Sequence, residues 1–380
     1  MLNTGNLEIT PTELADILEG GENIQVLDVR AAHRLAAGTV EAPNFVNETG
    51  SVIMGLDDPT QVGIDPSARV AVVCGHGNAS LTVAGFLAAK GFNALSLRGG
   101  VTAWMDMLRQ RVVPAPAGFD RLVQFDRVGK GALGYLVVCG DEALAVDPSR
   151  AWQTWADAAE AAGARLVGVA DTHVHADYIS GAPALSATLG VPYYLHAADA
   201  VYPYDETPGM VEFTAIRDGD EISVGSSAIT VCHTPGHTLG SVCFLLGEEA
   251  ILTGDFLFVG SIGRPDLAGR TEAWTGDLWA SLNAARATWP REAVVYPAHY
   301  GTDGERNPDL SVGRMFKELV GANPVLKITD EAEFRAYVNR GISAPPDAYR
   351  TIKAVNVGLA AVSSQEAQVL EAGKNECALG

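Results

Sequence analysis

Histidines and aspartates gather in a few short stretches of this 380-residue chain. The stretch DTHVHADYISG places His173, His175 and Asp177 at alternating positions, followed by Tyr178. In an extended segment, residues i, i+2 and i+4 face the same way, so these three side chains can converge on one point. Imidazole and carboxylate groups are donors that proteins use for zinc and non-haem iron. The stretch therefore predicts a metal site.

Further ligand candidates follow along the chain, namely His233 and His237 in HTPGHTLG, Asp255 in LTGD and His299 in YPAH. The Pro-Gly pair before His237 allows the backbone to turn sharply beside an ion. Each of these residues, like His173, lies at or just beyond the end of a predicted apolar strand. Ligand sites in α/β sheets gather at this edge, so we expect one shared site rather than separate hydrogen-bonded loop residues.

The elements that must position these residues form an α/β pattern that begins at about residue 120. Its strand candidates are GYLVVCG, EALAVD, RLVGVAD, VPYYLH, SAITVCHTP, VCFLLG, EAILTGD and EAVVYPAH. Its helix candidates include AWQTWADAAEAAG and EAWTGDLWASLNAARATW, and SAPPDAYRTIKAVNVG is expected to be a loop followed by a helix. Residues 6 to about 109 form a smaller α/β pattern, with NIQVLDVR and RVAVVCG as buried strands and NASLTVAGFLAAKG as a helix. The stretch VVPAPAG is the linker candidate.

The composition narrows the class of protein. A hydrophobic fraction of 47% and a charged fraction of 19% are typical of globular proteins. The net charge of −20 argues against nucleic acid or an anionic membrane as a partner. The sequence contains neither a signal-peptide pattern nor an apolar run of the ~18 residues needed to cross a membrane. Because its five cysteines are scattered, a reducing cytoplasm is expected.

Five motifs occur in the order THVHADYISG, HTPGHTLGS, TGDFLF, GRPDL and YPAH. They resemble the motifs of the metallo-β-lactamase fold and, more narrowly, of the branch that contains persulfide dioxygenases and glyoxalase II enzymes. The resemblance covers about residues 120–302, and the tail with PPDAYRTIKAVNVG is similar to the C-terminal segment of that branch. It implies an αββα sandwich, with residues 303–380 as an extension that packs on it.

The resemblance implies two alternative ligand sets for the first metal. In persulfide dioxygenases, one iron uses the equivalents of His173, His237 and Asp255, and His175 lies close by. In dinuclear hydrolases, the equivalent of His175 joins the two histidines, and Asp255 bridges to a second metal. Two imidazoles and one carboxylate form the facial triad of non-haem Fe(II) oxygenases. One Fe(II) per chain is therefore expected, with zinc as the alternative.

Position 178 bears on the second metal. In dinuclear hydrolases that metal uses the equivalents of Asp177, position 178 and His299. Here position 178 holds tyrosine, whose neutral phenol is a poor ligand at neutral pH. Tyr178 therefore argues against the two-metal hydrolase. It is expected to pack beside the site or to hydrogen-bond Asp177 or a water, and ligation as tyrosinate remains open.

Arg264 lies in GSIGRPDL, shortly after Asp255. By resemblance to persulfide dioxygenases, it matches an arginine that helps to hold the thiol substrate. A guanidinium suits a carboxylate because it forms paired hydrogen bonds. The alternative is an ion pair between Arg264 and Asp266 that closes the loop.

The stretch VVCGHGNASLTVAGF places Cys74 between a strand and a helix, where backbone N–H groups lower the pKa of a thiol. Together with VLDVR and LRGGVTAW, it resembles a rhodanese domain, here residues 1–112, with a linker at 113–119. The two arginines usual in rhodanese loops are replaced by Gly75 and Ala79, and a protonated His76 is the candidate for part of the lost charge. Cys74 is therefore either a catalytic sulfur carrier or a strand-end residue of a docking module.

The remaining cysteines and histidines have plainer expectations. Cys139, Cys232 and Cys243 lie in apolar strands and are expected in the core. Cys377 lies in a polar tail and is expected to be exposed. His33 and His196 have no predicted partner.

These features together predict a rhodanese–persulfide dioxygenase fusion. It would oxidise a low-molecular-weight thiol persulfide with O2 to sulfite and the free thiol, and it would serve sulfide detoxification. The expected partners are that persulfide, carried by glutathione or another cellular thiol, and dioxygen, and a homodimer is left open. The alternative is a glyoxalase II-like zinc thioester hydrolase, whose rhodanese module serves for docking or sulfur sensing.

Overall fold

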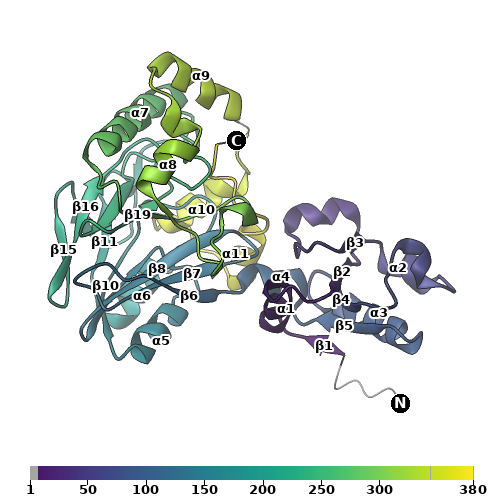
Figure 1. The fold of residues 1–380 in the computed structure, drawn as a ribbon. Coiled ribbons are helices and arrows are strands. Elements are labelled where there is room, and N and C mark those ends of the chain that lie inside the picture. The colour runs from purple at the N-terminus through teal and green to yellow at the C-terminus, as the bar shows by residue number, and fades with distance from the viewer. Residues whose placement is uncertain (1–6, 343, 380) are drawn as a thin grey trace. The chain divides into compact units, whose positions relative to one another are not determined.

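The computed structural model describes residues 7–342 and 344–379 of the chain. The chain divides into two units, one mainly of residues up to Arg109 and the other mainly of residues from Gln110 onward (Figure 1). The first six residues of the expected rhodanese-like domain lie outside the described residues, as does Ser343 at the start of SAPPDAYRTIKAVNVG.

Short aliphatic runs form a parallel sheet in the N-terminal unit, because such runs can be buried on both faces. The sheet has the order β1-β5-β4-β2-β3, and all of its pairs are parallel. Its strands are β1 (Glu8–Ile9), β2 (Ile24–Asp28), β3 (Phe45–Asn47), β4 (Arg69–Val73) and β5 (Asn93–Leu97). Its helices are α1 (Pro11–Glu19), η2 (Ala32–Ala37), α2 (Gly50–Met54), η3 (Pro59–Val62), α3 (Asn78–Ala89) and α4 (Gly100–Asp106). The two strands and the helix predicted for this region are confirmed.

Two sheets build the second unit. The seven-stranded sheet has the order β14-β11-β10-β9-β8-β7-β6. Its strands are β6 (Arg109–Val113), β7 (Arg121–Arg127), β8 (Ala132–Cys139), β9 (Glu142–Val146), β10 (Arg165–Ala170), β11 (Tyr193–His196) and β14 (Thr214–Ile216). The six-stranded sheet consists, in order, of β15 (Glu221–Val224), β16 (Ser227–His233), β17 (Val242–Leu246), β18 (Ala250–Gly254), β19 (Val294–Pro297) and β20 (Arg314–Met315). All eight strand candidates of this region are observed, and residues 113–119 lie with this unit.

The main core of the second unit lies between its two sheets. Alternate residues of each strand point inward, as a two-layer sandwich requires. Val137 and Leu144 from one sheet share a buried cluster with Val231, Phe244 and Leu252 from the other. The two sheets therefore close on each other and hold the loops at their ends in fixed places.

Helices cover both outer faces of the sandwich (Figure 1). On one side, α5 (Gln153–Ala161) and α6 (Ala182–Leu189) pack on β10. On the other side, Leu278 and Leu282 of α7 (Thr271–Thr288) pack with Ile251 and Val295. The layer order is αββα, so the expected fold class is confirmed.

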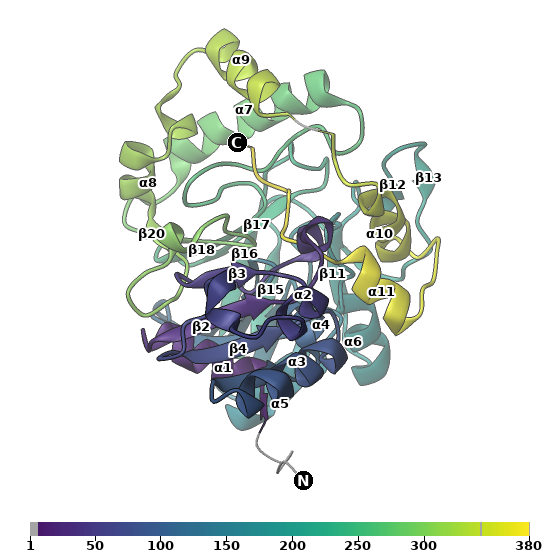
Figure 2. The same cartoon turned by 90° about the vertical axis from the view of Figure 1, so that its right-hand side faces the viewer.

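The segment after His299 adds further helices to this unit. They are η4 (Asp303–Glu305), α8 (Phe316–Ala322), η5 (Val325–Lys327), α9 (Glu331–Gly341), α10 (Ala348–Asn356) and α11 (Ser364–Leu370). Phe316 and Phe334 join the cluster of α7, whereas α10 and α11 lie side by side next to the hairpin of β12 (Val201–Tyr202) and β13 (Thr207–Pro208) (Figure 2). Across residues 7–342 and 344–379, no helix is both long and apolar enough to cross a membrane.

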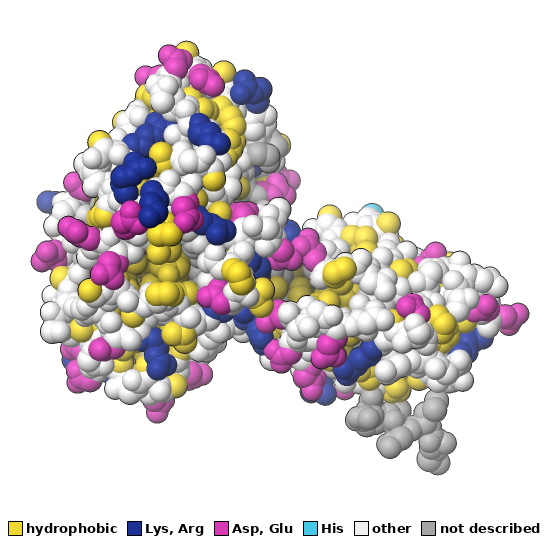
Figure 3. Space-filling model, viewed as in Figure 1, with side chains coloured by type: hydrophobic (Ala, Val, Ile, Leu, Met, Phe, Trp, Pro, Cys, Tyr) yellow, Lys and Arg dark blue, Asp and Glu magenta, His cyan; other side chains and the backbone are white. Residues whose placement is uncertain are grey.

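Acidic side chains are spread over the face in Figure 3 rather than gathered at one place. Histidine side chains are almost absent from that face. Most of the eight histidines are instead partly or fully buried, including all of those in the central site described below.

Candidate metal centre

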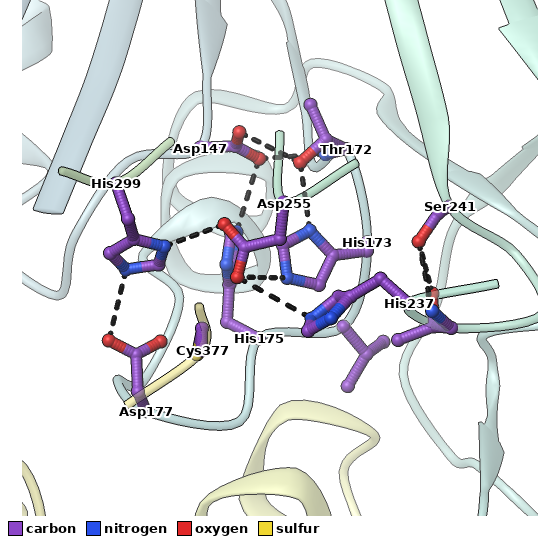
Figure 4. A network of polar contacts seen from close by, with 12 residues as sticks. Asp147, Thr172, His173, His175, Asp177, His237, Ser241, Asp255, His299 and Cys377 are labelled. Atoms are coloured by element: carbon purple, nitrogen blue, oxygen red, sulfur yellow. Dashed lines mark hydrogen bonds and ion pairs between the residues drawn. The ribbon is translucent and has the colours of Figure 1, made fainter. Parts of the chain in front are cut away.

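The candidate ligands stand where strands of both sheets end. Asp147 follows β9 and His173 follows β10 in one sheet, whereas His237, Asp255 and His299 follow β16, β18 and β19 in the other. These strands end at the same end of the sandwich, and His173, His237, Asp255 and His299 lie close together there (Figure 4). This agrees with the expectation drawn from the strand ends.

Three buried atoms of His173, His237 and Asp255 face one another. Oδ2 of Asp255 lies 3.6 Å from Nε2 of His173 and 3.4 Å from Nε2 of His237. Within the part of the chain that the structure describes, none of these three atoms has a hydrogen-bond partner, although the three residues are at most 1% exposed. A buried polar atom without a partner is costly, and a shared metal ion is what satisfies two imidazoles and a carboxylate together. These residues fit a metal.

The opposite edges of the two imidazole rings are anchored. Nδ1 of His237 donates to the carbonyl oxygen of Arg264 over 2.9 Å. Nδ1 of His173 lies 3.0 Å from Oγ1 of Thr172, which donates to Asp147 at 2.9 Å. Such outer contacts fix the tautomer and direct the lone pair of each Nε2 toward the ion.

Electrostatics favour the protonation states that ligands need. Burial lowers the pKa of His237 to about 3, and burial also lowers the pKa of His173. Burial alone would raise the pKa of Asp255, but His299 and His173 lower it well below its usual range. At neutral pH the cluster therefore offers two neutral imidazoles and one carboxylate.

Asp147 is a site residue that the sequence interpretation missed. Its carboxylate accepts from the backbone N–H and the hydroxyl of Thr172, and Oδ1 lies 3.1 Å from Nε2 of His175. Its backbone has a φ of 49°, a left-handed conformation that side chains rarely adopt. The signal was present, because Asp147 ends the strand EALAVD just as Asp255 ends EAILTGD.

Tyr178 is fixed by hydrogen bonds within the protein. Its hydroxyl lies 2.9 Å from Nε2 of His175 and donates to the carbonyl oxygen of Asp147 at 3.3 Å. Burial raises the pKa of Tyr178 well above its ordinary value, so the phenol stays neutral. The expectation of a hydrogen-bonding hydroxyl holds, but the protein partners observed are His175 and Asp147 rather than Asp177.

A second cluster lies on the other side of Asp255 (Figure 4). Nδ1 of His299 lies 2.6 Å from Oδ1 of Asp255, and Nε2 lies 3.0 Å from Oδ2 of Asp177. Burial lowers the pKa of His299, but the two carboxylates raise it to about 10. Cys377 completes this cluster, and the ligand atoms of Asp177, His299 and Cys377 lie within 4.8 Å of one another.

The expectation that Cys377 is exposed is wrong. Its side chain is fully buried, in a small cluster with Ala176, Leu267 and Tyr349. The polar composition of the tail suggested exposure, but the tail pairs with the loop after β18. Among the other cysteines, the expected burial is confirmed for Cys139 and Cys243, whereas Cys232 is only partly buried.

His233 lies outside these clusters. It ends β16 as expected, but its ring stacks on His196 with the centroids 4.2 Å apart, and Nε2 lies 2.9 Å from the carbonyl oxygen of Leu239. Grouping His233 with the shared site was therefore wrong. His196, for which no partner was predicted, has one.

Arg264 is held by Asp266. Nε and Nη2 of Arg264 each donate to a carboxylate oxygen of Asp266 at 2.7 Å, and the arginine is 2% exposed. The ion pair within the loop is thus present. The backbone carbonyl of Arg264 orients the imidazole of His237. A substrate contact of Arg264 stays a prediction.

In the N-terminal unit, Cys74 follows β4 and faces the start of α3. Sγ accepts from the backbone N–H of Gly77 at 3.1 Å and lies 3.2 Å from Oγ of Ser80. Burial alone would raise the pKa of Cys74, but the hydrogen bonds lower it by more. The pKa of the thiol is therefore below its ordinary value. His76 is exposed in the same loop, and its Nδ1 lies 3.1 Å from the hydroxyl of Thr102. The loop can therefore stabilise a thiolate or a persulfide.

Comparison with known proteins agrees with both units. The model of the metallo-beta-lactamase superfamily matches residues 130–299, and the model of the rhodanese-like domain matches residues 10–107. An uncharacterized protein of Mycobacterium leprae is 34% identical over 37% of this chain and 73% of its own length. A hydroxyacylglutathione hydrolase of Acidiphilium cryptum is 35% identical over 45% of this chain and 66% of its own length.

Solved structures extend the likeness to the fold. A metallo-beta-lactamase from Staphylococcus aureus has a TM-score of 0.56 and 26% identity, over 65% of this chain and 74% of its own. ETHE1 from Myxococcus xanthus has a TM-score of 0.50 and 24% identity, over 66% of this chain and 99% of its own, and this likeness concerns the fold alone. With its matching αββα sandwich and buried histidine–aspartate cluster, the chain belongs to the metallo-beta-lactamase superfamily and carries a rhodanese-like domain in its N-terminal unit.

Proposed function

We propose that the chain is a persulfide dioxygenase-like non-haem iron enzyme, with Fe(II) held by His173, His237 and Asp255. The observation that carries the proposal is the convergence of three buried, otherwise unpartnered ligand atoms in these residues, counted over the described part of the chain. Two imidazoles and one carboxylate leave other coordination positions of an iron ion open, as oxygenases require. Bound Fe(II) would supply the activation of O2.

The reaction is the oxidation of a persulfide, R–S–SH. Two oxygen atoms from one O2 are bonded to the terminal sulfur, which gives R–S–SO2H. Water then cleaves the S–S bond and leaves R–SH, sulfite and two protons. The terminal sulfur gives up four electrons and O2 accepts four, so no other reductant is needed.

The protein residues keep the reacting region dry and fixed. The three ligands are buried, and their outer partners, including Thr172 and Asp147, leave the imidazoles one orientation. His299, with a pKa of about 10, holds a proton between Asp255 and Asp177. This proton offsets part of the carboxylate charge beside the site.

A pocket next to the ligands is suited to a small charged thiol. It is lined in part by Val174, which lies between His173 and His175, by Thr238, which follows His237, and by Arg270 and Lys353. The same lining contains Asp199 and Glu206, and Arg270 pairs with Glu206. In this proposal a carboxylate of the thiol, such as that of glutathione, replaces Glu206 as the partner of Arg270. The sulfur atom of the thiol would then lie toward the metal ligands, and the charged groups of the thiol would stay in the pocket.

In this proposal the rhodanese-like unit handles sulfane sulfur on Cys74. The backbone N–H of Gly77 and the hydroxyl of Ser80 contact Sγ, which supports a thiolate nucleophile. Transfer from a donor R–S–SH to the Cys74 thiolate would give Cys74–S–S⁻ and R–SH, so sulfur atoms and protons balance. Cys74 then passes the same sulfur to a thiol.

The test is metal analysis combined with oxygen uptake. The purified chain is loaded anaerobically with Fe(II), given glutathione persulfide, and followed with an oxygen electrode while sulfite is assayed. One O2 consumed per sulfite formed is expected. Absence of uptake in a protein with iron bound would reject the proposal.

The second candidate is a zinc thioester hydrolase. It is favoured by the 35% identity to a hydroxyacylglutathione hydrolase. It predicts hydrolysis of S-lactoylglutathione by the zinc-loaded chain, without oxygen consumption. The two candidates are separated by supplying each substrate to the iron-loaded and to the zinc-loaded protein.

A further inference from the structure

Backbone hydrogen bonds from the start of α4 fix the loop that contains Cys74. The backbone N–H of Val101 donates to the carbonyl oxygen of Cys74 at 2.8 Å. The backbone N–H of Thr102 donates to the carbonyl oxygen of Gly75 at 3.1 Å. Gly100 permits this close approach, because a Cβ atom at position 100 would clash with the carbonyl oxygen of Cys74. The loop is therefore held in one conformation, with these two carbonyl oxygens turned toward α4.

Residues 75–79 offer one ionisable side chain beside the thiol. Their sequence is GHGNA, so the imidazole of His76 is that side chain, and it is exposed. The loop curves around Sγ of Cys74, which accepts from the backbone N–H of Gly77 and contacts the hydroxyl of Ser80. A sulfur donor that reaches Sγ therefore lies against this loop. Imidazole is the side chain whose ordinary acid–base chemistry lies near neutral pH, so His76 can exchange a proton with such a donor.

The hydroxyl of Thr102 orients the imidazole of His76. This hydroxyl donates to the carbonyl oxygen of Gly75 at 3.0 Å, and Oγ1 lies 3.1 Å from Nδ1 of His76. A hydroxyl has one proton and a carbonyl oxygen can only accept, so Nδ1 must donate to Oγ1. This assignment leaves Nε2 as the nitrogen that accepts a proton in the neutral ring and donates one in the protonated ring.

Sulfur transfer to Cys74 releases a basic leaving group. The thiolate of Cys74 attacks the terminal sulfur of the donor R–S–SH. The S–S bond of the donor breaks, and its electron pair stays on the sulfur that is bonded to R. An alkyl thiolate leaves slowly because it is basic, whereas a less basic thiolate leaves faster. A group that protonates R–S⁻ as it leaves therefore speeds this step.

We propose that His76 is the acid–base residue of sulfur transfer at Cys74, and that Thr102 positions it. The proposal rests on the sulfur-carrier function proposed above for the rhodanese-like unit. Nε2–H of the protonated imidazole gives its proton to R–S⁻, which leaves as R–SH. The new Cys74–S–SH then returns its proton to Nε2. The net reaction converts Cys74–S⁻ and R–S–SH into Cys74–S–S⁻ and R–SH, so atoms and charge balance and no other reductant or oxidant is needed.

Leaving groups of different basicity test the role of His76 in the full chain. Cys74 reacts in separate experiments with bis(2-hydroxyethyl) disulfide, whose leaving thiolate is basic, and with 4,4′-dithiodipyridine, whose leaving thiolate is stabilised by its ring. His76→Gln should slow the first reaction by about tenfold and the second by less than about twofold, because only the basic leaving group needs a proton. Alkylation by iodoacetamide releases iodide, so its rate should stay that of the wild type.

Matched variants separate this role from a structural one. The rates of Cys74→Ser are subtracted to remove the reactions of other thiols. His33→Gln, at an exposed histidine of η2, should behave like the wild type. Thr102→Val should slow the reaction with the basic leaving group by about threefold, but not in the His76→Gln background, because it acts through His76. An equal slowing of all three reagents in His76→Gln would assign its effect to the thiolate, and no slowing would exclude a role; either result overturns the proposal.

Uptake of sulfur from glutathione persulfide is measured separately, by mass spectrometry of the peptide that contains Cys74. A wild-type chain that forms no persulfide on Cys74 would reject the sulfur-carrier function, and the role of His76 in sulfur transfer would fall with it. Normal sulfur uptake together with disulfide rates that do not depend on His76 would overturn the role of His76 alone. The two failures are therefore distinguishable.

Discussion

The two reactive centres of this protein are assembled in opposite ways. The contacts of the Cys74 thiol come from Gly77 and Ser80, within one loop and the first turn of α3. The metal centre instead draws on five separate strand ends and on the C-terminal tail. The first centre needs correct local backbone geometry, whereas the second exists only when both sheets and the tail are in place.

This difference predicts how each centre fails. A substitution beside Cys74 should change the reactivity of one thiol and leave the rest of the chain intact. A substitution among the metal ligands leaves other buried polar groups without their partners, so its effects should spread to metal content and stability. The predictions below test this contrast.

Loss of the shared carboxylate should have the largest effect. Asp255→Asn removes the carboxylate that faces both His173 and His237. Oxygen uptake with glutathione persulfide should fall by roughly a thousandfold, about 4 kcal/mol in the barrier, because the metal is bound weakly or not at all. Asp157→Asn, at an exposed position of α5, is the matched control and should behave like the wild type. Full iron content and activity in Asp255→Asn would contradict the ligand set.

Removal of the rhodanese thiol should abolish the activity of one centre and leave that of the other almost unchanged. Cys74→Ser should reduce sulfur transfer from a persulfide donor to an acceptor thiol to the background rate, because the carrier atom is gone. Oxygen uptake with preformed glutathione persulfide should change by less than about twofold, since the ligand cluster lies in the other unit. Equal sulfur transfer by Cys74→Ser and wild type would identify the unit as a docking or sensing module.

Asp147 should have an intermediate effect. Asp147→Asn weakens the contacts to Thr172 and His175 that orient the histidine cluster. The metal affinity should fall by about 10–100-fold, as for other outer contacts of ligating histidines. Competition with a chelator measures this change, and Asp141→Asn, in the exposed turn just before β9, is the control. An unchanged affinity would show that Thr172 alone orients His173.

The pH dependence of Cys74 tests the local centre. Since its folded-state pKa is below the ordinary value, the thiolate should persist at lower pH than for a free thiol, and its reactivity should be lost as the pH falls through the folded pKa. Ser80→Ala should move the midpoint of iodoacetamide alkylation to higher pH and slow the reaction at neutral pH by about threefold. A midpoint unaffected by Ser80→Ala would assign the pKa to the backbone N–H groups.

Tyr178 should have the smallest effect on metal binding. Tyr178→Phe removes two hydrogen bonds and should lower the free energy of unfolding by about 1–2 kcal/mol, with the iron content unchanged. Tyr178→His should raise zinc occupancy without being required for oxygen chemistry. Tyr194→Phe, at a half-buried tyrosine of β11, is the control for unfolding. Loss of metal in Tyr178→Phe would make the phenol a ligand.

The strand pattern was the most predictable part of the molecule. All eight expected strands of the second unit are present, because continuous aliphatic runs bounded by glycine, proline and aspartate leave few alternatives. The same pattern placed His173, His237, Asp255 and His299 at one end of the sheets. It also placed His233 there wrongly, since a strand end fixes the position of the backbone but not the direction of the side chain.

The sequence by itself determined that histidines and aspartates sit at strand ends, and that a thiol precedes a helix in the N-terminal unit. Both follow from local periodicity and turn residues, which act over a few neighbours. Only the tertiary structure decided the partners of these groups. Asp147 entered the site because β9 pairs with β10, and Tyr178 bonded His175 because both are buried on one loop. Cys377 became a candidate ligand because the tail pairs with the loop after β18, a contact that no local pattern encodes.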